Sequence, residues 1–167
     1  MLAIQRPASR HHRSHYAAAR DAGSIAVDIV PFEPWHLDWL HLQETQEMLS
    51  PLLTQQYGTS LVSAGPCYSA FAGSQVIACA GVVEIWTGRA QVWSLLSDRM
   101  PRYRKSIHRA VRTFLLGYRV RRLECVVDPR HEAALRWATR LGFRVEHLMP
   151  QYNPDGSDQL MLVRREP

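Results

Sequence analysis

The chain has no apolar run long enough to cross a membrane. A membrane-spanning helix needs about 20 consecutive apolar residues, and here the 46% of hydrophobic residues are interleaved with polar ones. Arg6, Arg10 and Arg13 stand where a secretory signal peptide carries an apolar stretch. We therefore expect a soluble cytoplasmic protein that is not secreted and has no membrane partner.

Cysteine is scarce and lysine is almost missing. Cys67, Cys79 and Cys125 lie far apart in apolar segments, and no two of them form a Cys-x-x-Cys pair. Structural zinc sites and disulfide frameworks need closer and paired spacing, so we expect three reduced core cysteines and no metal site. Lys105 is the only lysine, and arginine supplies the rest of the positive charge.

The net charge of +5 is concentrated in two segments. In residues 1–24, four arginines against one aspartate give +3, without strand periodicity. We interpret this segment as a basic arm that a DNA or protein partner could contact, and residues 25–167 as one domain. In residues 98–119, seven basic side chains face a single acid. Such an excess predicts an anion-binding surface.

Hydropathy periodicity predicts alternating strands and helices. Strands are expected over residues 25–32, 67–72, 75–85, 90–96, 122–127, 144–152 and 159–163, and helices over residues 35–56, 107–118 and 129–141, the first of them divided at Pro51. Asp128 and Pro129 suit the N-cap and first position of the last helix, and Gly142 suits its left-handed C-cap. This order predicts an α/β (α+β) fold.

The last predicted helix carries a family motif. His131, Ala134, Trp137, Ala138, Leu141, Gly142 and Phe143 keep the spacing Asn-x-x-Ala-x-x-Leu-Tyr-x-x-Leu-Gly-Phe. With the order of elements, this motif resembles the GNAT N-acetyltransferases over residues 25–164. The resemblance implies a mixed, mostly antiparallel sheet of about seven strands flanked by about four helices. It also implies acetyl-CoA as cosubstrate and an amine acceptor, whose identity the sequence leaves open.

The same resemblance implies a place for CoA between the strands at residues 90–96 and 122–127. Its expected contacts are Leu95, Leu96, Arg99, Arg102, Arg104, Lys105, His131 and Trp137. The family's phosphate loop contains glycines, and residues 99–106 contain none. Two interpretations stay open: the side chains of Arg102, Arg104 and Lys105 hold the phosphates, or the segment is a solvated helix start on a protein that no longer binds CoA.

The proton chemistry of the family usually involves a tyrosine where this chain has Ala138. The candidate replacements as proton donor are Tyr152, Tyr103 and His131, and the candidate base is Glu84 near the end of a strand. Each has a structural alternative as a surface or helix-start residue. Ala138 itself has two alternatives: beside a bound thioester a tyrosine there adds a proton donor, whereas in a closed core it overpacks.

A second resemblance leads to a different function. Asp128, His131, the Arg136-Trp137 pair and residues 152–156 resemble GNAT-like proteins of tailed phages, some related to internal virion proteins of short-tailed phages. This implies a catalytically weak or inactive virion or accessory protein, located in the host cytoplasm or the virion. It would act through protein or DNA contacts, and its cleft would be filled by Trp93, Leu95 or Trp137. Assembly into a homo-oligomer is also left open.

Overall fold

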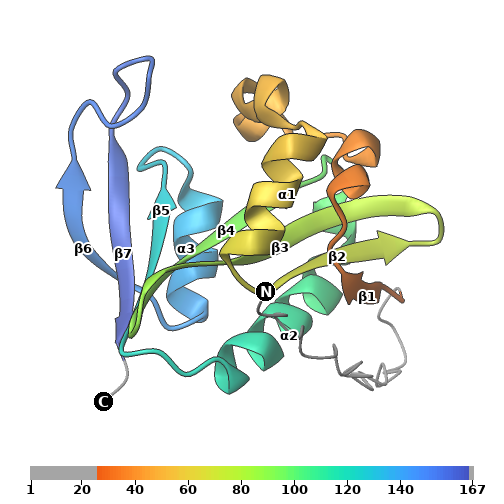
Figure 1. Ribbon diagram of the computed structural model, residues 1–167. Helices are drawn as coiled ribbons and strands as arrows, with labels where there is room; N and C mark the ends of the chain where they lie inside the picture. The colour runs from red at the N-terminus through yellow and green to blue at the C-terminus, as the bar shows by residue number, and fades with distance from the viewer. Residues whose placement is uncertain (1–25, 166–167) are drawn as a thin grey trace, which may run out of the picture.

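A seven-stranded sheet is the centre of the computed structural model, which describes residues 26–165 (Figure 1). Its order is β1-β2-β3-β4-β5-β7-β6. The strands are β1 (Asp28–Pro31), β2 (Cys67–Ala72), β3 (Gln75–Trp86), β4 (Arg89–Leu96), β5 (Arg122–Val127), β6 (Arg144–Met149) and β7 (Gln159–Arg165). Among these seven strands only β4 and β5 pair in parallel. The predicted α/β class and mostly antiparallel sheet are confirmed. The predicted basic arm, residues 1–24, lies outside the described residues.

Helical segments cover both faces of this sheet. They are η1 (Pro34–Trp39), η2 (Glu44–Leu52), α1 (Gln55–Ala64), α2 (Met100–Gly117) and α3 (Glu132–Arg140). Because side chains alternate along a strand, Trp93 and Leu95 of β4 pack with η1 and α1, whereas Val92 and Leu96 pack with α2 and α3. In residues 26–165 no helix is both long and apolar enough to cross a membrane.

The region over residues 35–56, predicted as helical and divided at Pro51, is helical in the structure but differs in the kind and the extent of its helices. The structure has two 3-10 helices there, η1 and η2, and the α-helix α1 begins only at Gln55. Pro51 lies inside η2 and has no N–H to donate, which disfavours a continuous α-helix. Thr54 then starts α1, because its side chain accepts a hydrogen bond from the Tyr57 N–H at 3.1 Å.

Helix α3 begins later than predicted and ends as predicted. Its N-cap is His131, not Asp128, whose carboxylate instead accepts hydrogen bonds from the Arg130 N–H and guanidinium. A charge-assisted partner two residues away therefore holds Asp128 in a turn before the helix. At the other end Gly142 has φ +93°, and the Phe143 N–H bonds the Ala138 carbonyl at 3.1 Å. The predicted left-handed glycine cap is confirmed.

Candidate active site

Strands β4 and β5 pair over only three residues and then diverge. The pairs are Arg89 with Arg122, Ala90 with Leu123, and Gln91 with Glu124. Beyond them β4 stays paired with β3 as far as Leu96, while β5 continues along β7 to Val127. Figure 1 shows the two strands separating toward their C-terminal ends. The family resemblance predicted a place for CoA between these two strands.

Two helix N-termini and one loop meet at this open edge of the sheet. Since β4 and β5 are parallel, α2 and α3, which follow them, both begin there. Strand β6 runs in the same direction as β5, so the loop over residues 150–158 also lies at this edge. The charges near Arg130 agree with this arrangement. The hydrogen bonds from Arg130 to Asp128 raise the pKa of Arg130, and the carboxylates of Asp155 and Asp158, in the loop over residues 150–158, raise it further. The predicted site residues His131 and Tyr152 therefore share one edge.

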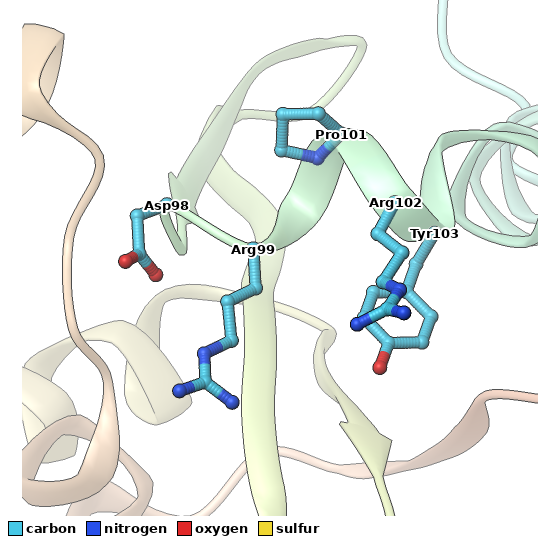
Figure 2. Close-up of a pocket in the computed structure, with 5 residues that line it drawn as sticks. All are labelled: Asp98, Arg99, Pro101, Arg102 and Tyr103. Carbon is cyan, nitrogen blue, oxygen red and sulfur yellow. The ribbon is translucent and has the colours of Figure 1, made fainter.

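A hollow of about 310 Å³ lies at the start of α2. It is lined by Asp98, Arg99, Pro101, Arg102 and Tyr103. Figure 2 shows the side chains of Arg99, Arg102 and Tyr103 extending to the same side, with the Asp98 carboxylate at one end. Arg99 donates a hydrogen bond to the Gln75 side chain at the start of β3. Asp98 and Arg102 lie at opposite ends of the hollow (Figure 2), so its positive end is the one that carries Arg102.

At the start of α2 the groups that can bind an anion are mainly side chains, because few backbone N–H groups are free there. Residues 100–106 belong to the helix and not to a loop. The Met100 N–H bonds the Ser97 carbonyl at 2.9 Å, the Arg102 N–H bonds the Arg99 carbonyl at 3.1 Å, and Pro101 has no N–H. Arg102, Arg104 and Lys105 are exposed, and the first turn has no acid. An anion held here would meet their charges and the helix dipole.

Glu84 lies apart from the other predicted catalytic residues. It is opposite Ala90, near the beginning of β4, because β3 runs antiparallel to β4. Its Oε1 accepts a hydrogen bond from the Tyr118 hydroxyl at 3.0 Å. Burial raises the pKa of Tyr118 to about 12, and the Glu84 carboxylate adds to this. The structure thus brings His131 and Tyr152 to the open edge and leaves Glu84 at the paired end.

Of the apolar residues predicted to contact CoA, Leu95 and Leu96 are buried in the core and Trp137 is half-buried against it. Leu95 and Leu96 are 4% and 7% exposed, so a ligand would reach them through their backbone. Trp137 packs in the cluster that contains Leu96 and Ile107, and its Nε1 donates to His108 Nδ1 at 3.1 Å. Tyr103 packs against the same cluster. Ala138 is only 7% exposed, in a cluster with residues of β5 and β7.

Sequence reasoning missed a buried acid at the point where β4 and β5 diverge. Glu124 is fully buried and accepts hydrogen bonds from Arg89, at 2.8 and 3.0 Å, and from Arg122. Burial raises the pKa of Glu124, but the hydrogen bonds from both guanidinium groups outweigh it, and the net pKa is lowered. Glu124 is therefore a fixed negative charge. The sequence did contain a sign of this site, because an acidic residue is rarely found inside an apolar strand such as the one over residues 122–127.

Residues 41–46 were missed as well. They run along the edge of β4 where β5 has diverged. The Gln46 side chain donates to the Ser94 carbonyl at 2.8 Å and accepts from the Leu96 N–H at 2.9 Å. The Gln43 N–H bonds the Leu96 carbonyl at 2.9 Å, and the Asp98 N–H bonds the His41 carbonyl at 3.3 Å. No spacing in the sequence indicates these contacts, because they join residues about fifty positions apart.

Comparison with known proteins identifies the fold. No protein-family model matches this sequence, and no curated protein matches it. Among solved structures, Ard1 from Thermoplasma volcanium is 16% identical with a TM-score of 0.70, covering 86% of this chain and 99% of its own. A chimera of the Vibrio cholerae spermidine N-acetyltransferase and hSSAT is 13% identical with a TM-score of 0.64, covering 83% and 95%.

A third structure agrees with these two. The IAA acetyltransferase from Bacillus cereus is 17% identical with a TM-score of 0.60, covering 84% of this chain and 100% of its own. Identities this low establish the fold and no more. The chain has the fold of the GNAT acetyltransferases, as the motif in residues 131–143 predicted. The resemblance to the phage branch and the roles assigned to individual site residues stay predictions.

Proposed function

We propose that the protein is an acetyl-CoA-dependent N-acetyltransferase that binds its cosubstrate between β4 and β5. The observation that carries this proposal is the divergence of two parallel strands after three residue pairs, beside a basic helix start. A diverging strand pair has backbone groups that are not used in the sheet, and these can pair with the amides of an extended ligand. The acetyltransferase names of the structural neighbours support the same class.

The phosphate end of CoA would lie at the hollow before α2. Arg102, Arg104 and Lys105 would hold the phosphates by charge-assisted hydrogen bonds, since guanidinium groups match phosphate geometry. The Asp98 carboxylate repels an anion, so we expect the phosphates on the Arg102 side of the hollow. The pantetheine would then run along β4, where the even-numbered residues Ser94 and Leu96 direct backbone groups away from β3.

Acetyl transfer requires an amine to attack the thioester carbonyl carbon. The C–S bond breaks, the CoA thiolate leaves, and the amine loses a proton to a base. A thiol pKa near 8.5 makes the thiolate a tolerable leaving group without a proton donor, which suits a chain with Ala138 at the family's tyrosine position. We assign the proton transfer to His131 and Tyr152, because the segments that carry them follow β5 and β6 at the open edge, whereas Glu84 lies at the paired end of β4.

Calorimetry with CoA tests the proposal. We expect binding that weakens as salt is added, because the phosphate contacts are exposed. The double variant Arg102→Ala/Arg104→Ala should weaken binding by about tenfold to a hundredfold, from two charge-assisted contacts. Arg140→Ala, an exposed arginine at the far end of α3, is the matched control and should bind like wild type. No heat at millimolar CoA would contradict the proposal.

A second assay identifies the acceptor. Acetyl-CoA is offered with a panel of amines that includes spermidine, which is named for one structural neighbour, and the released thiol is measured. His131→Ala should lower turnover with little change in CoA affinity, because its proposed role is in the proton transfer. Turnover equal to wild type would remove His131 from the proposed mechanism.

A further inference from the structure

Residues 41–46 occupy the edge of β4 with which a ligand bound between β4 and β5 would pair. The Ser97 N–H donates to the Ile77 carbonyl of β3 at 2.9 Å, so odd-numbered residues of this strand direct their backbone groups toward β3. The even-numbered residues Ser94, Leu96 and Asp98 therefore direct theirs toward the divergence. Four of these groups are bonded to residues 41–46, as described above.

Gln46 makes the contact that most resembles a bound ligand. Its carboxamide donates to the Ser94 carbonyl and accepts from the Leu96 N–H, at 2.8 and 2.9 Å. Pantetheine has two secondary amides, and each is trans, so each can turn either its N–H or its carbonyl oxygen toward the strand. Pantetheine and the Gln46 side chain therefore compete for the same β4 groups, and the strand cannot satisfy both at once.

The segment that carries Gln46 is held loosely on its outer side. Leu42 is buried and forms an isolated bridge with Ser97, which anchors one end. Helix η2, which contains Gln46, has no buried residue: Leu49 packs against the core and is only partly buried, and Met48 and Leu52 are 56% and 54% exposed. Segments with few buried contacts open at low free-energy cost. Gln46 can therefore leave β4 without loss of the main core.

We propose that residues 43–46, anchored at the buried Leu42, form a latch that closes the CoA cleft, and that Gln46 must leave β4 before CoA binds. This inference rests on the proposed function, since it assumes that CoA binds in the divergence. In the closed form the β4 groups are satisfied internally, and only the fraction of molecules with an open latch is competent to bind. The observed CoA affinity is then lower than the intrinsic affinity by that fraction.

Gln46→Ala tests the latch by removing both side-chain hydrogen bonds to β4. Two bonds of ordinary net strength shift the closed–open equilibrium by about fivefold to a hundredfold, and CoA should bind more tightly by the same factor. Gln46→Glu is a second variant of nearly the same size, which loses the donor to the Ser94 carbonyl and should also tighten binding. Gln56→Ala, an exposed glutamine on α1, is the matched control.

Hydrogen exchange at the Leu96 amide gives a readout that needs no ligand. This amide should exchange faster in Gln46→Ala than in wild type and Gln56→Ala, because its acceptor has been removed. Tighter CoA binding together with faster exchange supports the latch. Equal CoA affinity in wild type and both Gln46 variants overturns the latch and leaves the proposed function standing. No CoA binding by any of the folded proteins overturns the proposed function, and the latch with it.

Discussion

Ala138→Tyr places the family's usual side chain at a position that this structure buries. Ala138 is 7% exposed and packs in a cluster with Leu123, Phe143 and Leu162, which are 2%, 2% and 0% exposed. A phenol ring added to so closely packed a cluster displaces its neighbours, which costs about 1–3 kcal/mol. For a chain of this size that cost corresponds to a fall in Tm of roughly 2–12 °C. We expect no gain in acetyl transfer, because the ring has no open cleft to enter.

The matched control for this variant is Ala133→Tyr. Ala133 is on the same helix and exposed, so the two variants share the loss of helix propensity, about 0.5 kcal/mol. The difference between their Tm values therefore isolates the packing cost. Thermal unfolding and thiol release from acetyl-CoA are measured for both. If Ala138→Tyr melts like Ala133→Tyr, or transfers acetyl groups faster than wild type, the position faces a cleft and our placement of Ala138 is wrong.

Three further predictions concern ionisable groups. Glu124→Gln should lower the unfolding free energy by about 2–4 kcal/mol in chemical denaturation, because it leaves two guanidinium groups without their buried carboxylate. The folded pKa of Glu124 lies below its unfolded value, so its stabilisation is complete above a pH of about 4.3 and is lost as the pH falls through the folded pKa. Glu84→Gln should lower the pKa of Tyr118 from about 12, measured from phenolate absorbance. Burial raises the pKa of both Cys79 and Cys125 to about 12, so at pH 8 a thiol reagent should modify the half-buried Cys67 first.

Each of these has a clear contrary result. An acid unfolding curve for Glu124→Gln that matches wild type would mean that this carboxylate contributes nothing to stability. An unchanged phenolate titration in Glu84→Gln would separate Glu84 from Tyr118 in solution. Modification of Cys79 as fast as Cys67 in the folded protein would mean that the core around β3 opens readily.

The strands and the last helix could be predicted from sequence because local patterns determine them. The glycine cap at Gly142 depends on a backbone conformation that few residues adopt, and it appears as predicted, with φ +93°. The region over residues 35–64 was harder. Its apolar residues follow no single helical period, and its 3-10 turns are stabilised by packing on the sheet, as the 2% exposure of Leu37 indicates.

The candidate site could be predicted only in part, since its elements come together by topology. The excess of arginine at the start of α2 was visible as charge, and the structure places it at the same edge of the sheet as His131 because β4 and β5 are parallel. Glu84 was chosen for its place at a strand end, but β3 is antiparallel to β4 and ends at the opposite edge. Gln46 gave no signal, because its two hydrogen bonds depend on a contact between segments 48 and 50 residues apart.

An NMR titration of the isotopically labelled protein with CoA tests the central claim most directly. The account predicts that the amides of Leu96 and Asp98 on the β4 edge shift together with those of Arg102 and Tyr103 at the start of α2, with saturation as CoA is added. These amides follow the β4 edge into the phosphate end of the proposed cleft. Shifts confined to other surfaces, or no shifts at millimolar CoA, would contradict a cosubstrate site between β4 and β5.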